Sequence, residues 1–392
     1  MRAVPRHMIS RSGSAGVVLS AYISWVHVYL HVPFCARRCS YCDFAIAVRK
    51  QVPSEQYVAA VLKEWTLWQQ EPVWETGSEL QTIYFGGGTP SRVSPEAIGC
   101  LLDRISADRS VAADAEITLE ANPDDVTLAA AAAWRDAGVN RVSLGAQSFN
   151  PGVLSWMHRT HGVEQISRAV EVVRCAGIAD LSVDLIFGLP AVLERNWGED
   201  LEQAFALEPE HVSLYGLTVE AHTALGHWAA RGQVVPVDDG RYAAEFLTAH
   251  AALLDRGYEH YEVSNAGRPG HRARHNSAYW RRAPFIGLGP AAHSGFGAER
   301  RWNIREWAAY QRAMTAGRSA MEGRELLDDA AVALEELYLG LRTIEGLALE
   351  RVSETQVRQW ELEGWATLAG GRLQLTPEGW LRLDALVASI ER

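Results

Sequence analysis

The chain has 392 residues, with 37 lysines and arginines against 48 aspartates and glutamates, so its formal net charge at pH 7 is −11. This acidic balance argues against a general nucleic-acid-binding protein, which needs a cationic face, and a chain of this length buries a large core without a disulfide framework. Of five cysteines, three lie within eight residues, which indicates a reduced, cytoplasmic compartment and a metal or cluster site.

The N-terminal segment, residues 1–25, is expected to be a disordered extension. Residues 12–36 contain no Asp, Glu, Lys or Arg and follow three arginines, a combination that also suits a signal peptide or a membrane helix. Residues 26–32, however, alternate apolar and polar side chains with the period of a strand, and Pro33 ends the run. What precedes them is short and broken by serines, so we favour a loose extension or a misplaced start codon.

From residue 26 onward, strand-like runs alternate with helical stretches. The predicted strands are Val26–Val32, Thr82–Phe85, Glu116–Ala121, Arg141–Gly145, Leu181–Ile186 and His211–Tyr215. The predicted helices are Ser54–Gln70, Pro95–Ile105, Leu128–Ala137, Val163–Cys175 and Trp197–Leu207. Six β-then-α units predict an α/β fold with a parallel sheet covered on both faces. We expect residues 26–220 to form a full or partial (β/α)6 TIM barrel, with functional side chains at the carboxyl ends of its strands.

Beyond about residue 221 the pattern changes. A helix is expected at Arg241–Arg256, followed by a mixed region, Tyr258–Asn303, rich in glycine, histidine and aromatic residues, so residues 221–323 are interpreted as an extension of the barrel. Residues 324–392 predict a C-terminal α+β domain, winged-helix-like, with helices Ala330–Thr343 and Ser353–Glu363, a hairpin turning on Gly370-Gly371, and a last helix from Pro377. Its seven Lys/Arg against thirteen Asp/Glu favour packing or partner docking over DNA binding.

The strongest chemical signal is the run Cys35-x3-Cys39-x2-Cys42, directly after the first predicted strand. Three thiolates on one tight loop can hold three irons of a [4Fe–4S] cluster and leave the fourth iron open for another ligand. Two arginines inside the loop favour thiolates and an anionic cluster. The alternative is a zinc site with His31 as the fourth ligand. The other two cysteines, Cys100 and Cys175, lie on predicted helices and are expected in the core.

This cysteine spacing resembles the radical S-adenosylmethionine (SAM) superfamily. The lead-in Tyr29-x-His-x-Pro-Phe-Cys35 resembles one branch of it, the oxygen-independent coproporphyrinogen III oxidases and their relatives. The resemblance implies that the open iron chelates SAM, and that one electron from the cluster cleaves SAM to methionine and a 5′-deoxyadenosyl radical. A Gly-Gly-Gly-Thr-Pro run at 86–90 also fits, because consecutive glycines let the backbone approach a ligand closely. By resemblance, the SAM-contacting positions are Tyr29, Tyr41, Gly87, Gly88, Thr89, Glu120, Gln147, Arg159 and Asp184.

A second region points to one subfamily. The motif His275-Asn-x-x-Tyr-Trp280, together with the run Gly-Leu-Gly-Pro-Ala-Ala-His293, resembles the HemW heme chaperones, and this resemblance covers nearly the whole chain from about Val26. Phe44 stands where the oxidases carry a fourth cysteine, which also favours the chaperones. The resemblance implies heme as bound cargo, heme-accepting respiratory proteins as partners, an electron donor for the cluster and at most peripheral membrane contact, with an oligomer possible.

Two questions stay open at this level. Imidazole is a natural axial ligand of heme iron, so His275 is the candidate heme ligand, with His293 second, but His275 is equally readable as a structural, hydrogen-bonded histidine. The function also has alternatives in the same branch. One is an active coproporphyrinogen III oxidase, against which Phe44 counts, and the other is a radical SAM methyltransferase or cyclopropane synthase, against which the His275 motif counts. No catalytic residue is assigned.

Overall fold

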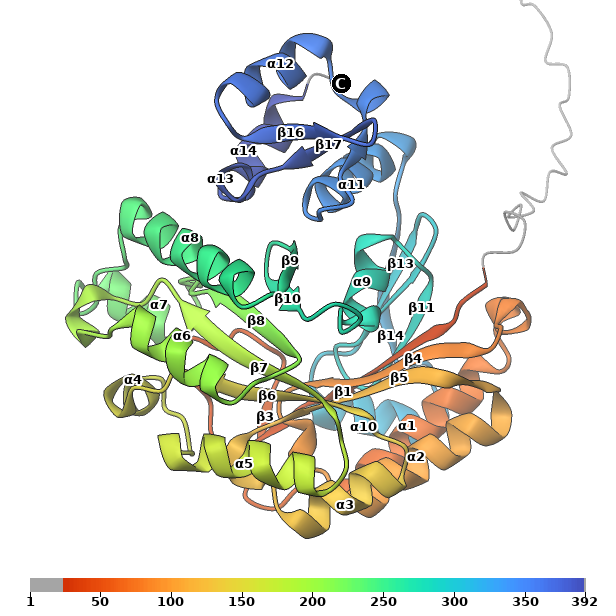
Figure 1. Ribbon diagram of the computed structural model, residues 1–392. Helices are drawn as coiled ribbons and strands as arrows, with labels where there is room; N and C mark the ends of the chain where they lie inside the picture. Colours follow the sequence, from red (N-terminus) through yellow and green to blue (C-terminus); the bar gives the residue numbers. More distant parts are fainter. Residues whose placement is uncertain (1–23, 391–392) are drawn as a thin grey trace, which may run out of the picture.

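Six parallel strands form the centre of a 12-stranded sheet in the computed structural model, which describes residues 24–390 (Figure 1). They lie side by side in chain order, as the six β-then-α units predict. These strands are β1 (His27–Val32), β4 (Leu80–Gly87), β5 (Val111–Ala121), β6 (Arg141–Gln147), β7 (Asp180–Phe187) and β8 (His211–Gly216). All six predicted strands are therefore confirmed. Most of their side chains are buried, because helices cover one face and the barrel interior the other.

The predicted crossover helices are confirmed to within a few residues. They are α1 (Ser54–Trp68), α2 (Pro95–Asp108), α3 (Leu128–Asp136), α5 (Val163–Cys175) and α6 (Trp197–Ala206), and Figure 1 shows α1, α2, α3 and α5 along one side of the sheet. Their starts follow local chemistry. Ser94 caps α2 by accepting a hydrogen bond from the N–H of Ala97, and Pro95 occupies the first helical turn.

The strands on both sides of the central six come from the segment expected only to be mixed, except the edge strand β14, which follows it. Antiparallel β10 (Asn265–Gly267) and β9 (Glu259–Glu262) extend it beyond β8, while β11 (Phe285–Leu288) pairs in parallel with β1. Antiparallel β12 (His293–Phe296), β13 (Glu299–Asn303) and β14 (Met321–Leu326) follow β11. The sheet runs in the order β14-β13-β12-β11-β1-β4-β5-β6-β7-β8-β10-β9 with two free ends, so the barrel is partial.

The remaining elements connect or flank this sheet. The short strands β2 (Phe34–Cys35) and β3 (Ala47–Val48) pair with each other across the cysteine loop. The further helices before residue 328 are α4 (Pro151–Trp156), α7 (Ala224–Ala230), α8 (Asp239–Asp255), α9 (Arg274–Trp280) and α10 (Trp307–Thr315). None of the described helices combines the length and hydrophobicity needed to cross a lipid bilayer.

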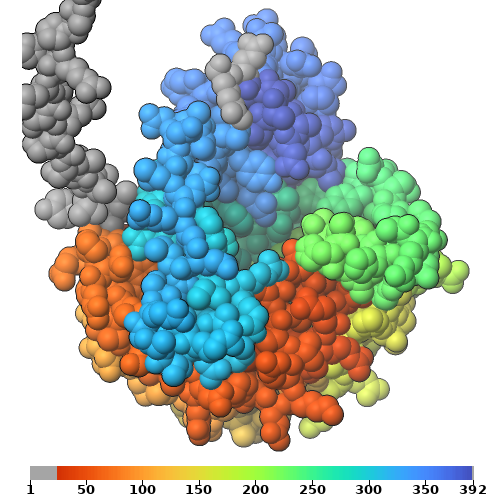
Figure 2. Space-filling view, turned by 180° about the vertical axis from the view of Figure 1, so that it is seen from behind, coloured from red at the N-terminus to blue at the C-terminus, as the bar shows by residue number. Residues whose placement is uncertain are grey.

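Residues 328–390 form a separate C-terminal lobe. Its helices are α11 (Asp329–Leu341), α12 (Glu354–Leu362), α13 (Pro377–Trp380) and α14 (Leu383–Ser389), and its strands β15 (Leu347–Ala348), β16 (Ala366–Ala369) and β17 (Arg372–Leu375) pair in the order β15-β17-β16. The expected last helix is thus two short ones. The expected boundary at residue 324 moves to about 328, because β14 pairs with β13. Seen from behind, a hollow separates this lobe (blue) from the green segment near α7 and α8 (Figure 2).

Two other expectations need correction. Trp25, assigned to the extension, is completely buried against Trp65 and Trp74, and its indole N–H donates to the carbonyl of Val73 at 3.0 Å, so the folded part includes it. The rest of the expected extension, residues 1–23, lies outside the described residues. The expectation that Cys100 and Cys175 belong to the core is wrong, since both are exposed on their helices.

Candidate functional site

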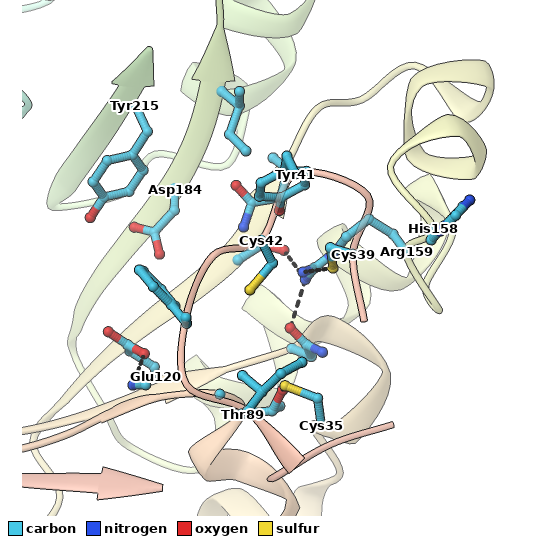
Figure 3. A pocket seen from close by; sticks show the side chains of 18 of the residues that line it. Cys35, Cys39, Tyr41, Cys42, Thr89, Glu120, His158, Arg159, Asp184 and Tyr215 are labelled. Atoms are coloured by element: carbon cyan, nitrogen blue, oxygen red, sulfur yellow. Dashed lines mark hydrogen bonds between the residues drawn. The ribbon is translucent and has the colours of Figure 1, made fainter. Parts of the chain in front are cut away.

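A cavity of about 420 Å³ opens at the carboxyl ends of β4, β5, β6, β7 and β8. Each of these strands ends in a side chain or glycine that lines it, as expected for a parallel α/β sheet. Figure 3 shows the three cysteines on one side of the cavity, with Glu120, Asp184 and Tyr215 on the other. The structure thus brings the cysteine loop together with five strand ends that are far apart in sequence.

The cysteine loop is held in place by contacts that do not involve its thiols. The N–H of Ser40 donates to the carbonyl of Met157 (3.3 Å), its hydroxyl donates to the carbonyl of Trp156 (3.2 Å), and its carbonyl accepts from the N–H of Leu225 (2.8 Å). Pairing of β2 with β3 closes the base of the loop. The backbone is therefore anchored to α4 and α7, and Cys35, Cys39 and Cys42 all line the cavity.

The surroundings of the thiols suit an anionic, metal-bound state. Thr89 donates a hydroxyl hydrogen bond to Cys35 Sγ (3.4 Å), and the Arg159 guanidinium lies 3.7 Å from Cys39 Sγ. Burial raises the pKa of the Cys35 thiol and raises that of Cys42 to about 11, so charge must be supplied to deprotonate them, as a bound metal does. The residues present therefore fit a thiolate-bound cluster.

A single-ion zinc site fits the loop less well. Within residues 24–390, no three His, Cys, Asp or Glu side chains are grouped closely enough to hold one metal ion. Four irons keep their thiolate ligands farther apart than one ion does. His31, the fourth ligand in the zinc interpretation, has both nitrogens hydrogen-bonded, Nδ1 to Tyr29 OH and Nε2 to the carbonyl of Ala45, each at 3.1 Å. The geometry favours the [4Fe–4S] interpretation.

The glycine run after β4 brings backbone against the cysteine loop. Gly87 has φ +111°, and a Cβ at this position would lie 2.6 Å from the His31 ring. At Gly88 a Cβ would lie 2.9 Å from the Pro33 carbonyl carbon. Both positions need glycine because the chain passes too closely for a side chain.

Replacing Gly87 with alanine is expected to lower the free energy of unfolding by about 1–3 kcal/mol more than Gly232→Ala, because overpacking is added to backbone strain. Gly232 is the matched control, since it also has positive φ (+68°) but no atom within 4 Å of a Cβ built there. Chemical denaturation of both variants checks this. Equal losses would mean that His31 moves away at no cost.

Two half-buried carboxylates face the cavity, Glu120 from β5 and Asp184 from β7. Glu120 accepts hydrogen bonds from Tyr84 OH (2.8 Å) and the Gly87 N–H (3.0 Å). Burial, together with the charge of Asp184, raises the pKa of Glu120 to about 7, although the two hydrogen bonds act to lower it. Burial also raises the pKa of Asp184, although it accepts bonds from Ser143 (2.9 Å) and Ser182 (3.3 Å). These groups can accept hydrogen bonds from the hydroxyls of a polar ligand.

Arg159 supplies a half-buried cation to the cavity. Its guanidinium donates to Asn122 Oδ1 (2.6 Å) and to the carbonyl of Gly145 (2.9 Å), while its Nε is buried without an acceptor. Gln147 is the last residue of β6. Its φ is +67°, and it lies where the register between β6 and β7 is interrupted. A guanidinium held this way, with an N–H left over, can clamp a ligand carboxylate.

Eight of the nine predicted SAM-contacting residues line this cavity. They are Tyr41, Gly87, Gly88, Thr89, Glu120, Gln147, Arg159 and Asp184. Tyr29 does not line it, because the β1–β4 register pairs it with Tyr84, three residues below the strand end, where the two rings stack at 6.1 Å. Sequence reasoning missed Asn122, Ser143 and Tyr215. Tyr215 lies near the end of β8. It could have been found by the rule that functional side chains lie at the carboxyl ends of parallel strands, which we call the strand-end rule.

His275 lies outside the cavity and is 1% exposed. Its Nδ1 is 2.6 Å from Thr82 Oγ1 and its Nε2 is 2.7 Å from Tyr279 OH, while its ring stacks on Tyr84 at 5.0 Å. Both nitrogens are therefore engaged, which agrees with a structural histidine. Heme ligation by His275 would first require one of these bonds to break. His293, the second candidate, is exposed at the start of β12.

Comparisons with known proteins agree with this geometry. The sequence profile described as "Radical SAM superfamily" matches residues 29–204. The chain is 35% identical to the heme chaperone HemW of Mycobacterium tuberculosis, over 93% of this chain and 94% of the relative. It is 40% identical to HemW of Escherichia coli (strain K12), over 68% and 69% of the two chains. Among solved structures, coproporphyrinogen III oxidase (HemN) from Escherichia coli superposes with a TM-score of 0.77 at 21% identity, covering 94% and 91% of the two chains.

Proposed function

The chain belongs to the HemW heme chaperone family of the radical SAM superfamily, and on this premise we propose that it binds heme and delivers it to respiratory heme proteins. We further propose that Cys35, Cys39 and Cys42 hold a [4Fe–4S] cluster whose open iron is completed by SAM. The observation that carries the cofactor proposal is the convergence of three thiols, a half-buried arginine and two carboxylates on one cavity. A cytoplasmic location and an external electron donor for the cluster belong to the same proposal.

Different residues of the cavity would bind different parts of the cofactors. The three cysteines would ligate iron, Arg159 would bind the SAM carboxylate, and Glu120 would accept hydrogen bonds from the ribose hydroxyls. The close-passing backbone at Gly87 and Gly88 leaves room for the methionyl end of SAM. When bound, the cluster and SAM supply a one-electron source and an exchangeable ligand to iron. Asp184 and Ser143 keep the far wall polar.

A coproporphyrinogen oxidase activity is the competing function in this branch. The likeness to the solved HemN structure, at 21% identity, concerns the fold alone. Phe44 lies on the cavity rim with its side chain 58% exposed, where the sequence comparison expects a fourth cysteine in the oxidases. This apolar group offers no thiol to a metal or substrate, which supports the chaperone function.

Titration of the anaerobically reconstituted full chain with hemin tests the proposed function. We expect saturable binding of one heme per chain, followed spectroscopically, and transfer of that heme to a heme-free respiratory protein. The same preparation, given coproporphyrinogen III, SAM and a reductant, is expected to form no protoporphyrinogen IX. Absence of stable heme binding would overturn the chaperone proposal, and product formation would replace it with the oxidase.

SAM affinity of the reconstituted protein is expected to fall as the pH drops below about 7. Glu120 has a pKa of about 7, above that of an ordinary glutamate, so it is mostly charged at pH 8 and mostly protonated at pH 6. Because the carboxylate is the better hydrogen-bond acceptor, we expect a roughly tenfold weaker affinity at pH 6 than at pH 8. Calorimetric titration checks this. Glu120→Gln should remove the pH dependence, and a flat profile in the unaltered protein would contradict the assignment.

A further inference from the structure

A second cavity, of about 390 Å³, lies between helix α9 and the C-terminal lobe. One wall consists of Tyr261 on β9 and the carboxyl half of α9 with the residues that follow it. The other wall consists of α11, the turn that leads into β15, and Arg372 on β17. We call this cavity the inter-lobe cleft. It shares no residue with the cysteine cavity.

The His-Asn-x-x-Tyr-Trp motif presents two different faces because it lies on a helix. His275 and Tyr279 are four residues apart on α9, so they share a face, and they are hydrogen-bonded to each other at 2.7 Å inside the barrel. Another face of the helix lines the inter-lobe cleft. It carries Ser277 and, three and four residues later, Trp280 and Arg281. The motif thus reaches a cavity through its tryptophan, while its histidine packs inside the barrel.

The inter-lobe cleft is rich in arginine, and Arg272, Arg281 and Arg282 are each paired with a glutamate in or beside it. Four arginines and two glutamates line it, whereas the chain as a whole carries a formal charge of −11. Several guanidinium N–H groups there have no protein acceptor. Within residues 24–390, Arg272 donates only through Nε, to Glu259 (3.0 Å), and Arg372 only through Nε and one terminal nitrogen, to backbone carbonyls at 2.6 and 2.7 Å. Their remaining N–H groups are available to an anionic ligand.

Trp280 adds a flat wall and an unused donor. Its Nε1–H is buried and has no hydrogen-bond acceptor among the described residues, a costly state for a polar group. The guanidinium of Arg342 lies 4.3 Å from the centre of its ring, and Arg342 is itself paired with the fully buried Glu262 at 2.9 Å. The ring is therefore held rigidly, as a binding wall for a planar ligand requires.

We propose that the inter-lobe cleft binds heme by its propionate edge, with Arg272 and Arg372 pairing with the two carboxylates and Trp280 contacting the macrocycle. This inference deepens the proposed function and rests on it, because it names the site of the cargo. Two guanidinium groups on opposite walls match the two carboxylates that a heme carries on one edge. It also explains why the tryptophan of the motif lies at a cleft between the barrel and the lobe.

The experiment compares hemin with hemin dimethyl ester, which has the same iron and macrocycle but no propionate charge. Both ligands are titrated into the full chain in the same dilute detergent. We expect the unaltered protein to bind hemin about tenfold or more tightly than the ester. In the double variant Arg272→Gln/Arg372→Gln this preference is expected to shrink to near one. Arg104→Gln, on the distant helix α2, is the matched control and should leave it unchanged.

The outcomes separate the site from the function. If the unaltered protein binds neither ligand, the chaperone proposal fails, and this site fails with it. If it binds both with equal affinity, or if the double variant keeps the full preference for hemin, heme binds elsewhere and only the site is overturned. The ester comparison needs no variant, so equal affinities for the two ligands overturn the site even if the double variant folds poorly.

Discussion

Replacing Cys39 with alanine is expected to reduce the iron content of the anaerobically reconstituted protein from about four atoms per chain to nearly none. Two remaining thiolates cannot hold a cluster that three bind from one loop. We expect the same result for Cys35→Ala and Cys42→Ala, measured as iron and acid-labile sulfide per chain. The cluster absorption and the EPR signal of the reduced protein, including its change when SAM is added, should be lost in parallel.

The loss of iron should occur without unfolding, because the contacts that anchor the cysteine loop do not involve its thiols. Ser40 holds it to Trp156, Met157 and Leu225 through hydrogen bonds of 2.8 to 3.3 Å. The variants should therefore keep the thermal stability of the unreconstituted protein. Cys100→Ala is the control, since this thiol is exposed on α2 and lines no part of the cysteine cavity. Full iron content in Cys39→Ala, or zinc in place of iron in the unaltered protein, would refute the cluster assignment.

The largest effect on stability is expected from Arg195→Met. Arg195 is 1% exposed, and it pairs with two carboxylates that are also buried, Glu245 at 2.5 Å and Asp200 at 3.5 Å. It also donates to the carbonyl of Ile186 (2.9 Å), next to the cysteine cavity. Removing the guanidinium leaves the buried Asp200 without its cation and Glu245 with only the partly exposed Arg241, at 3.0 Å, so we expect the free energy of unfolding to fall by about 3–5 kcal/mol. Denaturation in urea measures this loss.

Two further variants show that burial causes the loss. Arg256→Gln breaks an ion pair with Glu202 that has the same chemistry but is largely exposed, and it should cost about 0–1 kcal/mol. Adding Glu245→Gln and Asp200→Asn to Arg195→Met should restore part of the stability, because the unpaired buried charges are then gone. A cost below about 1 kcal/mol for Arg195→Met would mean that water reaches this network.

The sequence predicts the central fold well because its signals are local. Runs such as Val26–Val32 and Leu181–Ile186 carry their apolar pattern within a few residues, and the structure confirms them as β1 and β7. Ser94-Pro95 and Ser353 cap the helices that follow them, as their side-chain chemistry dictates. The outer strands β9 to β14 were missed, since runs of three to six residues become strands only when a neighbouring strand supplies partners.

The residues of the candidate site likewise include some that the sequence predicts and some that only the structure identifies. The proposed cluster ligands Cys35, Cys39 and Cys42 can be recognised in the sequence because they lie within eight residues of one another. Glu120, Gln147 and Asp184 were predicted from the resemblance to the family, and the strand-end rule for parallel sheets agrees with where the structure places them. Asn122 and Ser143 escaped notice because each acts through a partner, Arg159 and Asp184, that only folding brings near.

By itself, the sequence determined the α/β barrel, because periodicity is a property of neighbouring residues, and the resemblance of its motifs indicated the family and the proposed thiol ligands. Only the tertiary structure decided which face of α9 meets which surroundings. Its packing buries His275 against Tyr84 with both nitrogens bonded, and it opens Trp280 onto the arginines of the inter-lobe cleft. The six residues of the motif are known from the sequence, but their chemistry depends on contacts with Arg342 and Thr82, about 60 and 190 positions away, which no local pattern specifies.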